Sequence, residues 1–191
     1  MVLVVGLNGS PRHPGNTEIL LNEALKGTGK DAKIVRFDLA FMDVAPCQAC
    51  EDCFKDGECV LTDEMGKLYD LLEKADVIIV ASPIYFSGMS AQTKCVVDRC
   101  QALWVRRHLL KLNRRPGVGG IILAAAQPQA KFDNALSELR AFLIGIGVRP
   151  TGSITVGGLE RRGAVSERPE ALSQAFSLGQ ELVRSFNSPG P

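Results

Sequence analysis

The sequence predicts a single α/β domain in which helices cover both faces of a five-stranded parallel sheet. Short apolar runs alternate with amphipathic stretches along the chain, which is the pattern of strands joined by crossover helices. The run Val77–Ser82 (VIIVAS) is apolar up to its last residue, as expected of a strand buried on both faces. A length of 191 residues suits one domain, and neither an internal repeat nor an interdomain linker is visible.

Five segments have the length and composition of strands. Each is short, is rich in apolar or β-branched residues, and is bounded by turn-forming or helix-starting residues. The expected strands are Val2–Leu7, Lys33–Phe37, Val77–Ser82, Val118–Ala126 and Ser153–Val156.

Five segments with helical periodicity follow these strands. The first starts at Thr17, with Asn16 as its expected cap. The second lies within Thr62–Asp76, where Thr62 or Asp63 is expected to act as the cap. The other expected helices are Gln92–Leu103, Phe132–Ile146 and Pro169–Ser185.

This order of elements fits a three-layer α/β/α sandwich with sheet order 2-1-3-4-5, the flavodoxin-like arrangement. In such a sheet a ligand binds outside the carboxyl ends of the strands, where the first and third strands lie side by side. The domain is expected to cover residues 1–186, with a cysteine-rich loop at 46–60 and a flexible tail at 187–191.

Composition and charge narrow the class of protein. The chain has 46% hydrophobic and 23% charged residues and a net charge of +1, which favours neither a nucleic-acid partner nor an acidic tail. The apolar start lacks the basic flank of a signal peptide, and no run approaches the roughly 18 apolar residues of a membrane span. We therefore expect a cytoplasmic protein without a membrane partner, in which clustered cysteines hold metal or do redox work rather than form disulfides.

The loop after the first strand, NGSPRHPGNT (residues 8–17), has the composition of a phosphate site. Backbone N–H groups at the start of a helix favour an anion, and hydroxyl, amide and guanidinium groups can add hydrogen bonds. The loop is neither a Walker A motif nor a G-x-G-x-x-G fingerprint, which favours a mononucleotide; an ordinary strand–helix turn remains the alternative. The candidate residues are Ser10, Arg12, Gly15, Asn16 and Thr17.

The loop after the third strand, SPIYFSGMSA (residues 82–91), lies next to that phosphate site in the expected sheet. A flat conjugated ring needs apolar or aromatic walls and backbone donors at its polar edge, and this loop supplies both. Tyr85 and Phe86 could instead be core aromatics. With a phosphate loop on the neighbouring strand, flavin binding is the better interpretation.

The motifs GSPRHPGNT, CQACEDCFKDGECVLTDEM and ADVIIVASPIYFSGMSAQTKCVVDR, in this order, resemble the NADPH-dependent FMN reductase-like group of flavodoxin-fold proteins, and within it the iron–sulfur flavoproteins most of all. The resemblance is dense over about residues 1–100. It implies an FMN phosphate on Ser10, Arg12, Asn16 and Thr17, and an isoalloxazine ring against Pro83, Ile84, Tyr85, Phe86, Ser87 and Gly88.

A third flavin loop is expected after the fourth strand. In the family it usually carries glycines that close over the ring, whereas here it reads AAAQPQAKF, with Gln127 and Pro128 in their place. Contacts from Ala125 are expected by the resemblance, and this departure bears on how open the ring is.

Four cysteines follow the second strand at the spacing Cys47-x2-Cys50-x2-Cys53-x5-Cys59. Short x2 spacings let one loop aim three thiolates at a single centre, and Cys₄ ligation suits a [4Fe–4S] cluster. Zinc is a rival, although zinc sites usually pair two separated C-x2-C knuckles; empty or redox-active thiols are another. The resemblance implies that the four cysteines hold one [4Fe–4S] cluster.

The remaining chemistry-bearing residues are expected to be structural. Cys95 and Cys100 fit a helix face as small packing residues. His13 and His108 are isolated in the sequence, and His13 is expected to be a solvated loop residue, with a phosphate contact as the alternative. The basic stretch 104–117 (WVRRHLLKLNRRPG) is expected to be a solvated face rather than a site for the phosphate of NADPH or for an acidic partner.

Together these features predict an FMN-dependent electron-transfer flavoprotein with a [4Fe–4S] cluster and no catalytic acid–base pair, since the cofactors carry the chemistry. By the resemblance, ferredoxin or NAD(P)H is the electron donor, and the chain forms a homo-oligomer, a dimer or tetramer, in which the cluster loop faces the FMN of a neighbouring subunit. The alternatives are an FMN-only NAD(P)H-dependent reductase of quinones, nitro compounds or flavin, and a zinc-stapled binding module without enzymatic activity.

Overall fold

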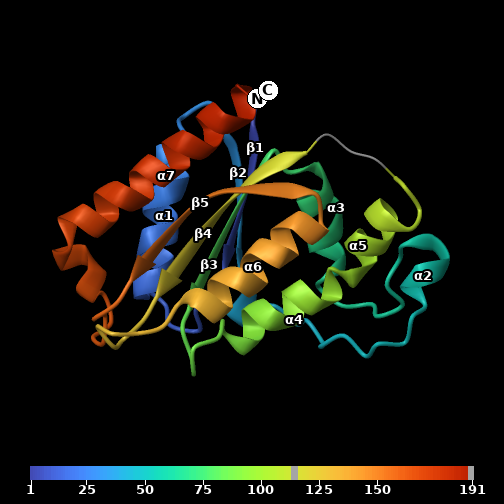
Figure 1. The fold of residues 1–191 in the computed structure, drawn as a ribbon, viewed down its shortest axis with the longest axis horizontal. Coiled ribbons are helices and arrows are strands. Elements are labelled where there is room, and N and C mark those ends of the chain that lie inside the picture. The colour runs from blue at the N-terminus through green and yellow to red at the C-terminus, as the bar shows by residue number, and fades with distance from the viewer. Residues whose placement is uncertain (113–115, 189–191) are drawn as a thin grey trace.

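The computed structural model describes residues 1–112 and 116–188, and it confirms the expected fold (Figure 1). Five parallel strands form one sheet in the order β2-β1-β3-β4-β5. The strands are β1 (Leu3–Asn8), β2 (Lys33–Asp38), β3 (Val77–Pro83), β4 (Gly117–Ala124) and β5 (Val148–Val156). The helices are α1 (Asn16–Gly27), α2 (Cys53–Asp56), α3 (Gly66–Lys74), α4 (Ala91–Arg99), α5 (Gln101–His108), α6 (Asp133–Gly145) and α7 (Pro169–Asn187), with short 3-10 turns at Leu39–Phe41 and Ala164–Glu167.

The sheet separates two apolar cores. Helices α1 and α7 cover one face, and α3, α4, α5 and α6 lie on the other (Figure 1). Because side chains alternate along a strand, Ile78 packs into the core on the α3–α6 side, whereas Ile79 packs beneath α1 and α7. All residues from Val77 to Ser82 are buried, as the unbroken apolar run predicts.

The fifth strand is longer than expected. It runs over nine residues, from Val148 to Val156, and pairs in parallel with β4, with a register shift at Gly119/Gly120. Its first half contains Pro150 and Gly152, which are tolerated because β5 is an edge strand. Those two residues conceal the strand in the sequence.

The expected helix Gln92–Leu103 is two helices that meet at Cys100. Ser90 caps the first, and its Oγ accepts the N–H of Thr93 at 3.3 Å. The second continues to His108, into the stretch expected to be a solvated basic face. That expectation is wrong for Arg106, which is buried, and residues 113–115 of the stretch lie outside the described residues.

Two expected caps and one boundary are also corrected. Gly15 occupies the N-cap of α1, and Asn16 is its first helical residue. Helix α3 begins only at Gly66, after Met65 at the N-cap, so neither Thr62 nor Asp63 caps it. Helix α7 includes Asn187, one residue into the expected tail, and residues 189–191 lie outside the described residues.

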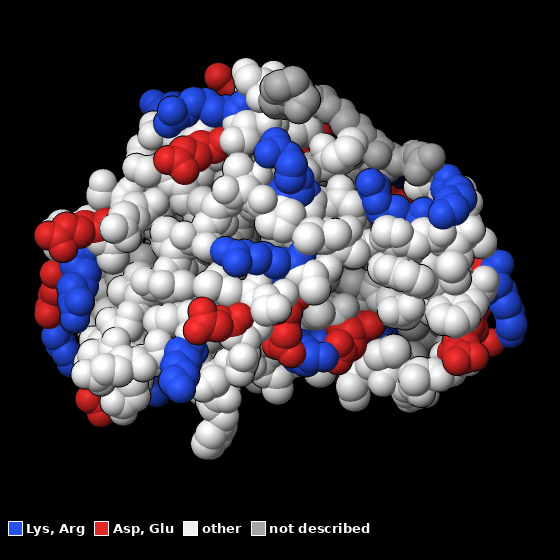
Figure 2. Space-filling model, viewed as in Figure 1, with Lys and Arg blue, Asp and Glu red and all other residues white. Residues whose placement is uncertain are grey.

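The surface agrees with the balanced composition. On the face shown in Figure 2, basic and acidic side chains are intermixed over a largely uncharged surface. None of the helices in the two described ranges has both the length and the hydropathy that a membrane crossing requires.

Candidate functional site

One candidate site lies at the carboxyl ends of the strands, where we expected a ligand. Loops after β1, β3, β4 and β5 converge there on a small pocket, called here the edge pocket. Its enclosed volume is about 70 Å³, below the roughly 300 Å³ of a closed cofactor pocket, so a larger ligand would extend into open space. The edge pocket is lined by Ser10, Arg12, Asn16, Thr17, Pro83, Ile84, Tyr85, Ala124, Ala125, Ala126 and Leu159.

The loop after β1 is held in shape by its own hydrogen bonds and by β3. The N–H of Gly9 donates to the carbonyl of Ala81 at 2.8 Å, and the hydroxyl of Ser90 donates to the carbonyl of Gly9 at 2.7 Å. The Ser10 Oγ accepts the N–H of Arg12 at 3.2 Å. The Cβ of any residue at position 15 would lie 2.6 Å from the carbonyl oxygen of Arg12, so this turn requires glycine.

Asn16 links this loop to the segment after β5 instead of capping α1. Its amide nitrogen donates to the carbonyls of Leu159 at 3.0 Å and Arg161 at 2.9 Å, and its Oδ1 accepts the N–H of Val165 at 3.1 Å. These acceptors lie more than 140 residues away in the sequence, which is why a local capping rule misses them. The fourth loop, with Leu159, is a part of the site that sequence reasoning did not identify.

A buried carboxylate lies beneath the same loop. Glu18 accepts the N–H of Gly15 at 3.3 Å, His13 Nδ1 lies 2.9 Å from its carboxylate, and Arg36 Nη2 lies 3.0 Å away. Arg36 also pairs with Asp38 at 2.7 Å. Burial lowers the pKa of Arg36, but hydrogen bonds to Asp38 and Glu18 more than offset this and raise it. His13 is therefore not isolated, and neither is His108, whose Nε2 lies 3.0 Å from the carbonyl oxygen of Gly145.

The loop after β3 forms a tight turn at the rim of the edge pocket. Tyr85 and Gly88 exchange two backbone hydrogen bonds of 3.0 Å. Phe86 and Ser87 between them have positive φ angles of 49° and 66°, a strained conformation for residues other than glycine. Phe86 is fully exposed, so the core-aromatic alternative is wrong for it. Gly15, Phe86, Ser87 and Gly88 do not line the edge pocket; the last three border an open groove along α6.

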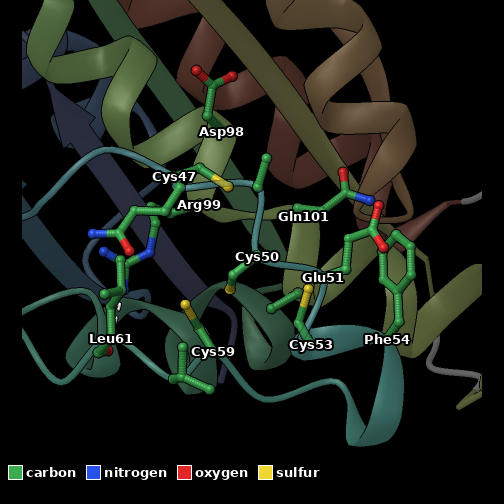
Figure 3. Close-up of a pocket in the computed structure, with 14 residues that line it drawn as sticks. Cys47, Cys50, Glu51, Cys53, Phe54, Cys59, Leu61, Asp98, Arg99 and Gln101 are labelled. Atoms are coloured by element: carbon green, nitrogen blue, oxygen red, sulfur yellow. Dashed lines mark hydrogen bonds between the residues drawn. The ribbon is translucent and has the colours of Figure 1, made fainter.

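A second candidate site is a cavity of about 380 Å³ around the four clustered cysteines, called here the cysteine cavity (Figure 3). The sulfur atoms of Cys47, Cys50, Cys53 and Cys59 lie around a common space. Burial raises the pKa of Cys53, and the charges of Cys59, Cys47 and Cys50 raise it further, so Cys53 lies close to the other three thiols. No three His, Cys, Asp or Glu side chains of the described residues are placed to hold a single metal ion.

The backbone of the cysteine cavity is also strained. Ala49 and Glu51 have positive φ angles of 52° and 64°. Together with Phe86 and Ser87, they make four of the five described non-glycine residues in this conformation, the fifth being Lys111. Such residues cost about 1–3 kcal/mol each and gather at functional sites, and here they lie in the two loops that the sequence singles out.

Arg99 of α4 holds both ends of the cysteine loop from inside the protein. The side chain is completely buried, and its Nη atoms donate to the carbonyls of Ala45 at 2.9 Å and Leu61 at 3.3 Å. It also pairs with both carboxylate oxygens of Asp63. Burial raises the pKa of Asp63, but hydrogen bonds from Arg99 and from the N–H groups of Ala45 and Met65 more than offset this and leave it lowered.

Arg106 of α5 holds the middle of the same loop. Its Nε donates to the carbonyl of Gly57 at 2.9 Å, and its Nη atoms bind Glu58 and Glu73, the latter at 2.8 Å. Gly57 has a φ of 82°, and a Cβ there would lie 2.4 Å from Cγ of Arg106. Sequence reasoning missed both arginines, because arginine is usually exposed and only long-range contacts mark these two.

The two cysteines outside the cysteine loop, Cys95 and Cys100, take no part in the cysteine cavity. All six cysteines are free thiols, and neither Cys95 nor Cys100 lines the cysteine cavity. Cys100 is buried in the core on the α3–α6 side, and burial raises its pKa, which confirms a packing role.

Comparison with known proteins places the chain in a family. The family model of NADPH-dependent FMN reductase matches residues 2–158. An iron-sulfur flavoprotein of Methanocaldococcus jannaschii is 32% identical over 142 residues, which cover 74% of this chain and 71% of the relative. An iron-sulfur flavoprotein of Archaeoglobus fulgidus is 31% identical over 189 residues, which cover 96% of this chain and 80% of the relative.

Solved structures agree on the fold. The NAD(P)H:quinone oxidoreductase from Methanothermobacter marburgensis has a TM-score of 0.70 and 16% identity, over 95% of this chain and 96% of that one. At this identity the likeness concerns the fold alone. The match of the family model over most of the chain, together with these relatives, shows that the chain belongs to the NADPH-dependent FMN reductase family as an iron–sulfur flavoprotein, and that it is an FMN-dependent oxidoreductase.

Proposed function

We propose that the protein is an electron-transfer flavoprotein with FMN at the edge pocket and a [4Fe–4S] cluster in the cysteine cavity. The observation that carries the proposal is the convergence of four thiols on one cavity of about 380 Å³ that shares no lining residue with the edge pocket. When bound, FMN exchanges electrons in pairs or singly and the cluster exchanges them one at a time.

The edge pocket suits the phosphate end of FMN. Its Asn16 and Thr17 lie at the start of α1, where backbone N–H groups and the helix dipole favour an anion, and Ser10 and Arg12 of the preceding loop add a hydroxyl and a positive charge. Pro83, Ile84 and Tyr85 supply an apolar wall for the ring. Phe86, Ser87 and Gly88 would contact the part of the ring that extends beyond the enclosed volume.

The cysteine cavity suits a cluster better than a single ion. A tetrahedral zinc site with bonds of about 2.3 Å holds its sulfur atoms about 3.8 Å apart, whereas no three ligand side chains of the described residues are placed for a single ion, and the four thiols line a cavity of about 380 Å³. Buried arginines already hold the loop in place. The chain's own contribution is therefore to present four thiols on a loop that is held in place.

We further propose that electrons pass between subunits of a cytoplasmic homo-oligomer, a dimer or tetramer, with ferredoxin or NAD(P)H as the donor. Figure 1 places α2 and the cysteine loop beyond α5, away from the carboxyl ends of β1 and β3. A neighbouring subunit can bring its flavin to the cysteine loop. A structure of the assembly in which every cluster lies far from every flavin would rule out direct transfer.

The test of the proposal is the cofactor content of protein purified without oxygen. We expect flavin together with about four iron and four sulfide per chain, as one cubic cluster requires. Flavin with zinc, or zinc without flavin, would overturn the cluster assignment, and absence of flavin would overturn the edge-pocket assignment.

The second candidate is an FMN-only NAD(P)H-dependent reductase of quinones, nitro compounds or flavin. The observation in its favour is that Cys47 and Cys50 are exposed, as reactive thiols are. It predicts flavin absorbance without iron or sulfide in the same preparation.

A further inference from the structure

A buried positive charge borders the cysteine cavity. Arg99 lines the cavity from α4 and is 1% exposed. Its Nη atoms are saturated by Ala45, Leu61 and Asp63, but its Nε has no hydrogen-bond partner. Of all buried side-chain nitrogen and oxygen atoms in the described residues, only this Nε lacks a hydrogen-bond partner. A buried donor left unpaired costs about 1–3 kcal/mol, and an acceptor bound in the cavity that Arg99 lines would remove that cost.

Cys59 is the clustered cysteine whose charge acts on the pKa of Arg99. Burial lowers the pKa of Arg99, but its hydrogen bond to Asp63 and the charges of Tyr69 and Cys59 raise it above the ordinary value, so the guanidinium stays charged. Tyr69 contacts this arginine directly, because its hydroxyl donates to the backbone carbonyl of Arg99 at 3.1 Å. Arg99 and Cys59, a thiol that we assign to the cluster, are therefore close enough for their charges to interact.

We propose that Arg99 is a positioning residue that raises the reduction potential of the cluster, by donating its Nε–H to a sulfur atom in the cysteine cavity. This inference rests on the proposed function, because it needs the cluster to be present. Four thiolates give a [4Fe–4S] cluster a net negative charge, and reduction adds one more electron. A donor and a fixed positive charge beside it stabilise the reduced state more than the oxidised state.

Arg106 provides a matched control. It is also a buried arginine, 7% exposed, that holds the cysteine loop through a backbone carbonyl and two carboxylates. It does not line the cysteine cavity, and its Nε is occupied by the carbonyl of Gly57. A substitution at Arg106 therefore disturbs the anchoring of the loop without removing a donor from the cavity.

The experiment is a redox titration of the cluster, followed by electron paramagnetic resonance, in the wild type, Arg99→Lys, Arg106→Lys and Asp63→Asn. Lysine keeps the charge but lacks Nε, so Arg99→Lys should lower the ratio of reduced to oxidised cluster at a given potential about tenfold, a shift of about 59 mV for one electron. Arg106→Lys should shift the potential much less, because it removes no donor from the cysteine cavity. Asp63→Asn should raise it, because the charge of Arg99 then loses its counter-ion.

The outcomes separate this inference from the proposed function. If the wild type holds no iron, the cluster assignment fails and this inference fails with it. If the wild type holds a cluster but Arg99→Lys matches its potential, or Arg106→Lys shifts equally, the inference is overturned while the proposed function stands. If Arg99→Lys does not take up a cluster, Asp63→Asn decides: a raised potential supports the inference, and an unchanged one overturns it.

Discussion

The edge pocket and the cysteine cavity are built in different ways. The edge pocket is assembled by the topology of the sheet, because four loops leave adjacent parallel strands at the same edge. The cysteine cavity lies away from the strand ends, on a loop with one short helix, and it depends on side chains from α4 and α5 to hold its shape. The first is fixed by the backbone of the fold, and the second by two buried arginines.

Because of this difference, substitutions in the two sites should have different effects. A change at Thr17 in the edge pocket is expected to weaken the binding of the proposed ligand and to leave the loops in place, because the loop after β1 is held by the hydrogen bonds of Gly9 with Ala81 and Ser90. A change in the anchors of the cysteine cavity moves the backbone that carries the thiols. The following predictions test that contrast, from the largest expected effect to the smallest.

Substitution of a clustered cysteine should abolish the metal centre and spare the flavin. Cys53→Ala removes a thiol that interacts with the other three, and we expect complete loss of iron and sulfide. FMN content should be unchanged, because Cys53 does not line the edge pocket. Iron, sulfide and flavin analysis measures both.

The control is Cys95→Ala, which changes a cysteine outside the cysteine cavity. It should keep its full iron content. Loss of flavin in Cys53→Ala would contradict the independence of the two sites.

Gly57→Ala should destabilise the fold by about 3 kcal/mol. Its positive φ disfavours a side chain, and the new Cβ would lie 2.4 Å from Cγ of Arg106. The side chain of Arg106 cannot move away without losing hydrogen bonds, because its guanidinium binds Gly57, Glu58 and Glu73. Chemical denaturation of the metal-free protein measures the free energy of unfolding.

Gly29→Ala is the matched control for this prediction. Gly29 also has a positive φ, of 93°, but nothing lies within 4 Å of a Cβ there. It should cost about 1 kcal/mol from backbone strain alone. Equal losses in the two variants would show that Arg106 does not hold the cysteine loop rigidly.

Asp63→Asn should cost about 2 kcal/mol at pH 7, because it removes the charge that pairs with buried Arg99. The pKa of Asp63 is lowered in the folded protein, so the carboxylate stabilises the fold above its unfolded-state pKa. That contribution is lost as the pH falls from the ordinary pKa of about 3.8 through the lower folded-state value. Denaturation of both proteins between pH 7 and pH 3 should therefore show the gap narrowing in acid, and a gap that is constant over this range would contradict the account.

Thr17→Val should have the smallest effect. It keeps the shape of a buried residue of the edge pocket but removes its hydroxyl, so FMN should bind about tenfold more weakly, or about 1.4 kcal/mol. Stability and iron content should not change. Thr155→Val changes an exposed residue of β5 and should leave the affinity for FMN unaltered. If both variants bind FMN equally weakly, the hydroxyl of Thr17 does not contact the ligand.

The sequence predicted most of the fold and the place of both candidate sites. The buried run of β3, the sheet order and the grouping of four cysteines follow from local patterns: apolar periodicity, turn residues and spacing. The edge pocket follows from topology once the strands are assigned. Ser10, Arg12, Asn16, Thr17 and Pro83 to Tyr85 accordingly line one pocket, and their contacts with FMN stay a prediction.

What the sequence did not predict depends on contacts between distant segments. Asparagine is a common helix cap, but the side-chain amide of Asn16 donates to the carbonyls of Leu159 and Arg161 instead. Arg106 belongs to a basic stretch with the pattern of a solvated face, and only the loop carbonyl of Gly57 and two carboxylates explain its burial. Neither partner set is visible in a local window of sequence.

The most direct test of the two-site account is a crystal structure of anaerobically prepared protein, with anomalous diffraction at the iron edge. The account predicts one compact group of iron atoms bounded by Cys47, Cys50, Cys53 and Cys59, and a flavin phosphate beside Ser10 and Thr17. A single metal peak between the cysteines, or a flavin away from the edge pocket, would contradict it.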